Sequence, residues 1–199
     1  MTGEHGWTNA VPALLLVLAL SVFPAAAGTG DPRVIGLRVE GGGEDYRVSY
    51  SVESALSEDI LERIHSGMRI AFRHRIEMYA KRAVPLWFPK TLSWTVVETA
   101  VEFDGLTKQY HLSRSYSLRR KGKAWEGPTR IADEERDTDS LDVVRIWMTE
   151  VDGVPLLPVD SEVPISRRRV DVTCSMGRKF VWMMFPVTVT ASAESTLEN

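Results

Sequence analysis

Cysteine is almost missing from this sequence of 199 residues, which contains Cys174 and no other. A single cysteine excludes an internal disulfide framework and a zinc site built from four cysteines. An excess of charge of one sign is missing as well, because 24 lysines and arginines stand against 27 aspartates and glutamates. That balance argues against a partner that is a nucleic acid. The composition fits one soluble globular domain.

A run long enough to span a membrane is also lacking, although the amino terminus is apolar. Residues 11–27 form an apolar stretch of 17 residues that ends in three alanines, whereas a full span needs about 20. Residues 1–27 are therefore predicted to be a signal peptide that is cleaved between Ala27 and Gly28. The first ten residues contain Glu4 and no lysine or arginine, which departs from the usual signal. The alternative is an uncleaved inner-membrane anchor over residues 11–27, which would make the protein membrane-associated.

Cleavage would release residues 28–199 as a single periplasmic or extracytoplasmic domain. In such an oxidising compartment an unpaired thiol is expected to be buried. Val172, Cys174 and Met176 alternate with polar residues, so Cys174 is predicted to be a small core residue on the apolar side of a strand.

Most of the chain alternates between apolar and polar residues, which predicts β-strands. The predicted strands cover residues 35–39, 46–52, 68–78, 93–103, 110–118, 168–176 and 180–190. Asp104 and Gly105 supply turn chemistry for a hairpin between the fourth and fifth strands, and the last two strands are predicted to meet near Gly177. About seven strands with short connections favour an antiparallel β-sandwich over a parallel sheet.

Two short helices are predicted, over about residues 57–67 and 141–148. Ser57 is predicted to cap the first helix with its hydroxyl group, and Gly67 is predicted to end it. The proline-rich residues 151–164 are expected to form an irregular crossover.

The sequence contains no recognisable catalytic or metal-binding motif, and no cofactor is predicted. His65, His74 and His111 lack a second ligand at metal-site spacing. His74 interrupts an apolar face, and a core histidine is favoured there over a catalytic one. The alternative, an enzyme that uses His74 or His111, requires a carboxylate or hydroxyl within hydrogen-bond reach of the ring. The acidic residues 133–139 are interpreted as a solvated loop in preference to a calcium site.

Several charged residues alternate with the apolar ones on the predicted strands. Glu98 and Glu102 would lie about 13 Å apart on one strand, too far for a glycosidase pair. They are expected to face Arg73 or Arg75 on the neighbouring strand. Arg69, Arg73 and Arg75 are candidate contacts for an anionic surface such as lipid headgroups, although ordinary surface charge balanced by nearby acids is favoured.

Aromatic residues and methionines suggest where a partner would dock. Residues 180–186 are apolar at both alternating positions, so they are interpreted as a central strand buried on both faces or as an exposed docking patch. The candidate partner or ligand surface consists of Trp87, Phe88, Trp182 and Met184. The first hypothesis is a non-enzymatic module that binds an envelope protein. The second is a small-molecule or lipid carrier, in which these residues line an apolar cavity of at least about 300 Å³ between the sheets.

Seven stretches of the chain carry a resemblance to a known family. They are Asp45–Val48, Leu61–Met68, Phe72–Glu77, Pro85–Phe88, Asp104–Arg114, Val144–Glu150 and Asp152–Leu156. The most specific stretch is Leu106 to Arg114, which reads Leu-Thr-x-x-Tyr-x-Leu-Ser-Arg. Over about residues 34–185, their order resembles the bacterial exported family called domain of unknown function 4390. This resemblance implies an envelope location and a mostly β domain, and it supplies no reaction, cofactor or catalytic residue.

Overall fold

The computed structural model describes residues 30–42, 45–81, 89–120, 129–156, 163–181 and 185–197. These residues form nine β-strands, two α-helices and one short 3₁₀-helix. The strands are β1 (Arg33–Gly42), β2 (Asp45–Glu53), β3 (Ile70–Ala80), β4 (Lys90–Asp104), β5 (Gln109–Arg120), β6 (Thr129–Thr138), β7 (Glu150–Leu156), β8 (Arg168–Val181) and β9 (Phe185–Thr196). The helices are α1 (Glu58–His65), α2 (Leu141–Thr149) and η1 (Ile165–Arg167).

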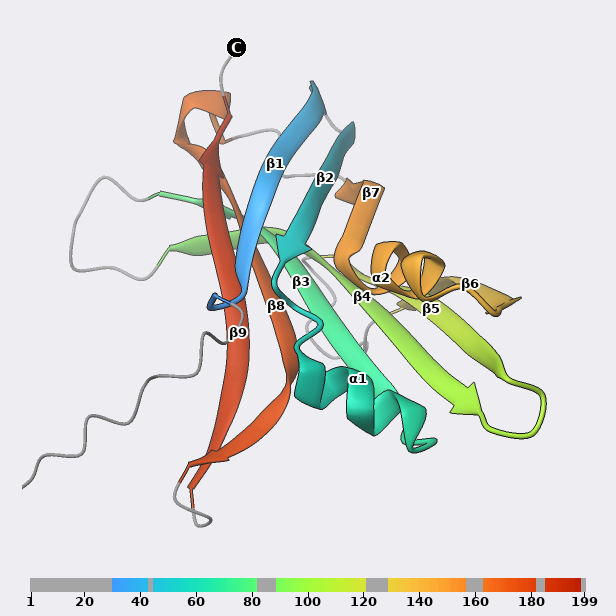
Figure 1. The fold of residues 1–199 in the computed structure, drawn as a ribbon. Helices are drawn as coiled ribbons and strands as arrows, with labels where there is room; N and C mark the ends of the chain where they lie inside the picture. The colour runs from blue at the N-terminus through green and yellow to red at the C-terminus, as the bar shows by residue number, and fades with distance from the viewer. Residues whose placement is uncertain are drawn as a thin grey trace, which may run out of the picture.

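The described strands form two antiparallel sheets. A three-stranded sheet has the order β1-β2-β7, and a six-stranded sheet has the order β6-β5-β4-β3-β8-β9. The three-stranded sheet, α1 and α2 all lie on one side of the six-stranded sheet (Figure 1). The predicted mainly β, sandwich-like fold is confirmed, with nine strands in place of about seven.

Strand β3 shows how the alternation in sequence becomes two different faces. Phe72, Ile76 and Met78 are fully buried, while Arg73 and Arg75 on the same strand are exposed. Both neighbours of β3 are antiparallel strands, β4 on one side and β8 on the other. A strand in this position has no free edge, so its side chains meet either the core or the opposite face.

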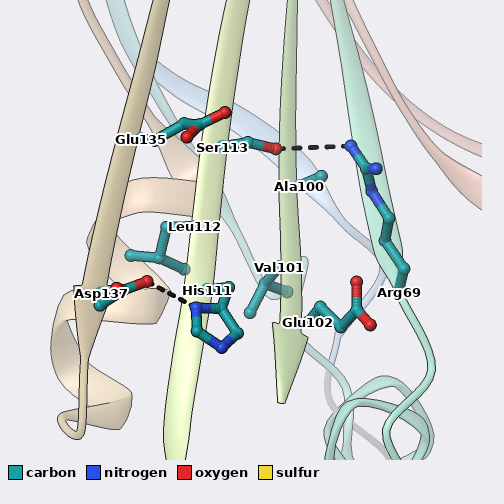
Figure 2. A pocket seen from close by; sticks show the side chains of 9 residues that line it. All are labelled: Arg69, Ala100, Val101, Glu102, His111, Leu112, Ser113, Glu135 and Asp137. Atoms are coloured by element: carbon teal, nitrogen blue, oxygen red, sulfur yellow. Dashed lines mark hydrogen bonds and ion pairs between the residues drawn. The ribbon is translucent and has the colours of Figure 1, made fainter. Parts of the chain in front are cut away.

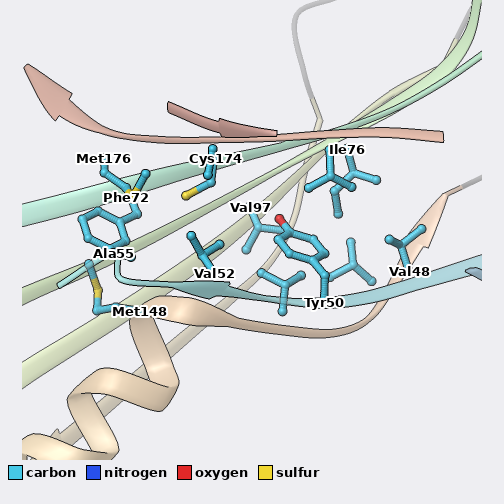
Figure 3. Packing of buried hydrophobic residues seen from close by; sticks show 14 of the residues in the cluster. Val48, Tyr50, Val52, Ala55, Phe72, Ile76, Val97, Met148, Cys174 and Met176 are labelled. Carbon is cyan, nitrogen blue, oxygen red and sulfur yellow. The ribbon is translucent and has the colours of Figure 1, made fainter. Parts of the chain in front are cut away.

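The core fills the space between the sheets (Figure 3). Val48 from β2, Phe72 and Ile76 from β3, and Met148 from α2 are all fully buried there. Cys174 on β8 is fully buried as well, which confirms its interpretation as a core residue. Burial raises the pKa of this thiol to about 12, so the sulfur stays protonated at neutral pH.

Helix α1 has its predicted position but lacks the predicted cap. Ser57 occupies the N-cap position, yet its side chain makes no capping hydrogen bond, and its hydroxyl is buried without a partner among the described residues. Ile60 and Ile64 are the buried residues that hold the helix against the core. Gly67 follows the helix with a φ of +81°, a left-handed conformation that glycine adopts without strain.

Two segments predicted to be irregular are strands. Residues 133–138 belong to β6, which pairs with β5 at the edge of the six-stranded sheet. The sequence of β6 lacks the alternation of apolar and polar residues that predicts a strand, because an edge strand is largely solvated and can carry charges on both faces. Val151, Val154 and Leu156 are buried on β7. The register between β2 and β7 shifts near Gly153, so the spacing of these buried residues departs from strict alternation.

The end of the chain also differs from the prediction. The register of β8 against β9 shifts between Ser175 and Arg178, and Gly177 in this interval has a φ of +102°. Gly177 therefore marks a bulge, and the strand continues past it to Val181. The strand predicted over residues 180–190 has other bounds, because β8 ends at Val181 and the edge strand β9 begins at Phe185. Residues 182–184, within the segment interpreted as a buried strand or a docking patch, lie outside the described residues.

Candidate functional site on the open face

The six-stranded sheet has a second face, opposite the core, which we call the open face. The three-stranded sheet, α1 and α2 pack on the core side, and none of the described helices or strands covers the open face (Figure 1). Strand alternation places Arg73 and Arg75 of β3, Glu98 of β4 and Ser115 of β5 on this face. A face of this kind presents side chains from several adjacent strands to one ligand or partner.

One depression on the open face lies over β4, β5 and β6 and has a volume of about 520 Å³. We call it the β5–β6 hollow. It is lined by Arg69, Ala100, Val101, Glu102, His111, Leu112, Ser113, Glu135 and Asp137 (Figure 2). Ala100 and Ser113 lie directly opposite each other on β4 and β5. Their short side chains leave room between the longer charged residues around them.

A histidine–carboxylate pair occupies one side of the β5–β6 hollow. His111 Nδ1 lies 2.6 Å from Asp137 Oδ1, across β5 and β6 (Figure 2). The hydrogen bond that His111 donates to Asp137 raises the pKa of His111 above its ordinary value, and the negative charge of Glu102 acts in the same direction. Across the hollow, an Arg69 amino group lies 3.4 Å from the hydroxyl of Ser113.

A second depression of about 500 Å³ lies over β3, β4 and β8. We call it the β3–β8 hollow, and Arg73, Arg75, Glu77, Trp94, Val96, Asp171, Thr173 and Ser175 line it. The guanidinium of Arg75 is 2.8 Å from a carboxylate oxygen of Glu77 and 5.6 Å from the centre of the Trp94 ring. Partial burial, with the nearby charge of Glu77, raises the pKa of Asp171.

A smaller hollow of about 80 Å³ adjoins the β5–β6 hollow. It shares Arg69, Ser113 and Glu135 with that hollow and adds Glu98 and Asp133. The two depressions therefore form one continuous acidic region across β4, β5 and β6.

The three candidate arginines lie together on the open face, but each meets acidic or polar neighbours. Arg73 is directly opposite Glu98 in the register of β3 and β4, as expected for cross-strand neighbours. Arg75 pairs with Glu77, and Arg69 lines the β5–β6 hollow with Glu102 and Glu135. The ion pair of Arg75 with Glu77 is the kind of acidic neighbour that the favoured interpretation expects.

The four candidate aromatic and methionine residues, Trp87, Phe88, Trp182 and Met184, lie outside the described residues.

The comparisons with known proteins agree with the motif order. The family described as "Domain of unknown function (DUF4390)" matches residues 32–197. The chain belongs to this family. The match confirms the resemblance noted in the sequence and extends it through β9. No curated protein and no solved structure matches the chain, so the function of this DUF4390 domain is argued from its own geometry.

The two histidines named for an enzyme, His74 and His111, each have the required group within reach of the ring, in different surroundings. His74 Nδ1 is 3.0 Å from the hydroxyl of Tyr50, but the His74 side chain is fully buried in the core. A substrate would have to displace the core to reach it. His111 has Asp137 as its carboxylate and is exposed to solvent. Catalysis there would also need a nucleophile or a substrate group at the ring.

Sequence reasoning missed Arg114, which points toward the core side of β5. One amino group of Arg114 donates hydrogen bonds to the backbone oxygens of Trp147 at 2.6 Å and Glu150 at 3.0 Å. Its guanidinium lies 4.5 Å from the centre of the Trp147 ring. The cation therefore binds free carbonyl groups at the carboxyl end of α2. An arginine at an apolar position of the alternating pattern was the available signal.

Neither a metal site nor a membrane-spanning helix was found in the described part of the chain. Within residues 30–42, 45–81, 89–120, 129–156, 163–181 and 185–197, no group of three or more histidine, cysteine or acidic side chains is placed to hold a metal ion. No helix in these ranges has the length and apolar character that crossing a membrane requires.

Proposed function

We propose that this DUF4390 protein is an exported, non-enzymatic binding module that contacts another envelope protein through its open face. The observation that carries this proposal is the open face itself, where hollows of about 520 and 500 Å³ lie on one antiparallel sheet. Both hollows draw their side chains from hydrogen-bonded neighbouring strands, so the surface exists before a partner arrives. A preformed surface loses little entropy on binding.

The polar character of this face favours a protein partner over an apolar ligand. Carboxylates, arginines and hydroxyl groups line both hollows, with Trp94 and Val96 as the larger apolar members of the β3–β8 hollow. Pockets for lipids and most small molecules are lined predominantly by apolar side chains. Between the two sheets, where a carrier would hold its ligand, the buried side chains of the core occupy the space.

The exported location rests on the amino-terminal sequence. The apolar run over residues 11–27 and the small residues before Gly28 support a cleaved signal peptide. The proposal places residues 28–199 in the periplasm or another extracytoplasmic space.

Photo-crosslinking in intact cells of the native host tests both parts of the proposal. A photoreactive amino acid replaces Ser115 on the open face in one strain and Glu62 on α1 in a control strain. The expected result is one recurrent protein adduct from position 115, none from position 62, and a mature chain that starts at Gly28. Equal labelling from both positions would contradict the assignment of the open face. A chain that retains Met1 would contradict cleavage.

A further inference from the structure

Three carboxylates around the β5–β6 hollow are not engaged by other side chains. Glu98 and Glu102 are exposed on β4, and Glu135 is exposed on β6. No hydrogen bond or ion pair of the described residues engages any of the three, although the negative charge of Glu102 helps to raise the pKa of His111. They are solvated anions at the margin of a depression, and each is available to a ligand of opposite charge.

Glu102 and Glu135 line the β5–β6 hollow, and Glu98 lines the smaller hollow that adjoins it. Glu98 and Glu102 flank Ala100 on β4 at about 13 Å from each other by the strand rise. Glu135 on β6 lies directly opposite Ser113 on β5. A long side chain that enters over Ala100, beside the Arg69 amino group at Ser113, would therefore meet carboxylates on more than one side.

The wider face has the same sign of charge. Seven carboxylates and three arginines that line the three described hollows lie on this face, leaving out Arg114 and its cross-strand neighbour Glu134 on the core side. One of those arginines, Arg75, is engaged within the chain by Glu77. Acidic surroundings of this kind attract cations and repel anionic lipid headgroups or acidic polymers.

Arg75 shows within the chain which group this face binds. Its guanidinium sits beside the Trp94 ring and contacts Glu77. A carboxylate together with an aromatic ring is a favourable environment for a guanidinium or ammonium group. The open face thus already holds one arginine side chain against a carboxylate in the β3–β8 hollow, and the β5–β6 hollow offers a partner's cation carboxylates without a Trp, Tyr or Phe ring.

We infer that the β5–β6 hollow binds a lysine or arginine side chain on a basic segment of the partner protein, with Glu98, Glu102 and Glu135 as its counter-charges. This inference rests on the proposed function and names the chemistry of the partner. Arg69 and the His111–Asp137 pair border the same hollow and limit how far the basic segment extends along the strands.

A fluorescent peptide of alternating lysine and serine is the probe, with a glutamate–serine peptide of the same length as the reverse-charge probe. The mature chain, residues 28–199, is titrated into each peptide, and binding is measured by fluorescence anisotropy at low and at physiological salt concentration. The test variant carries Glu98→Gln, Glu102→Gln and Glu135→Gln. A matched control removes three negative charges from α1 through Glu58→Gln, Asp59→Asn and Glu62→Gln.

The basic peptide is expected to bind the native protein and the α1 control alike, and to bind the open-face variant about tenfold more weakly or worse. Equal weakening in both variants would show attraction to overall negative charge and would overturn the inference. Preferential binding of the glutamate–serine peptide, or of phosphatidylglycerol vesicles, would overturn it as well. Circular dichroism and urea unfolding confirm that both variants are folded.

The two proposals fail separately in these experiments. A crosslinked partner at position 115 combined with no loss of peptide binding in the open-face variant refutes the cationic inference and leaves the binding module standing. Absence of a position-specific adduct refutes the binding module, whatever the peptide does.

Discussion

Acid is predicted to destabilise the fold through His74 at the centre of the core. This side chain is fully buried and lies on β3 directly opposite Cys174 of β8, with the Tyr50 hydroxyl 3.0 Å from its Nδ1. Burial lowers the pKa of His74 from its ordinary 6.5 to about 4, and the positive charge of Arg114 acts in the same direction. Burial also raises the pKa values of Tyr50 and Cys174, so neither supplies a negative charge to compensate.

The sign of the effect follows from which state binds the proton. Between pH 6.5 and about pH 4 the unfolded chain carries the proton on His74 and the folded chain does not. Unfolding is therefore favoured as the pH falls through this window, while stability does not depend on His74 above it. The difference between the two pKa values corresponds to about 3 kcal/mol of unfolding free energy.

Urea unfolding at about pH 7 and about pH 4 measures this quantity. His74→Asn removes the titrating ring and keeps an acceptor for the Tyr50 hydroxyl. The native protein is expected to lose about 3 kcal/mol more than the variant between the two pH values. Arg38→Gln, at an exposed side chain on β1, is the control and retains the native pH dependence. Equal pH dependence in the native and His74→Asn proteins would refute the reasoning.

Three further predictions concern single contacts. Asp137→Asn removes the hydrogen-bonded carboxylate that raises the pKa of His111, so an NMR titration should show that pKa falling toward its ordinary value; an unchanged midpoint would contradict the pairing. Arg114→Met leaves the carbonyl groups of Trp147 and Glu150 without their cation and is expected to cost about 1–3 kcal/mol of unfolding free energy in a urea titration. Native stability of this variant would refute the capping role. Cys174 should react with a thiol reagent no faster than the protein unfolds, because the sulfur is buried and its pKa is about 12; rapid labelling under native conditions would contradict the structure.

The fold was predictable wherever strict alternation reflects strict burial. Phe72, Ile76 and Met78 alternate with charged residues, and the structure buries the apolar members and exposes the others. Prediction failed where a bulge or an edge breaks that relation. Two residues of β7 stand opposite Ser49 of β2, so Val151 and Val154 depart from simple alternation. Strand β6 carries charged residues because it borders solvent.

The candidate site was predictable in its ingredients and not in its arrangement. Cross-strand proximity of Arg73 and Glu98 follows from alternation on neighbouring strands, and the register confirms it. The approach of Asp137 to His111 could not be foreseen, since it required recognition of β6 as a strand paired with β5.

The sequence by itself determined the family, the mainly β architecture and the burial of Cys174, because local alternation and motif order are written in neighbouring residues. Tertiary structure alone decided that one face of the six-stranded sheet stays open and that Glu98, Glu102 and Glu135 gather around one hollow. The physical reason is that strand order and register join residues far apart in the chain. A pattern of period two says which side chains share a face, and only the pairing of strands says which of them become neighbours.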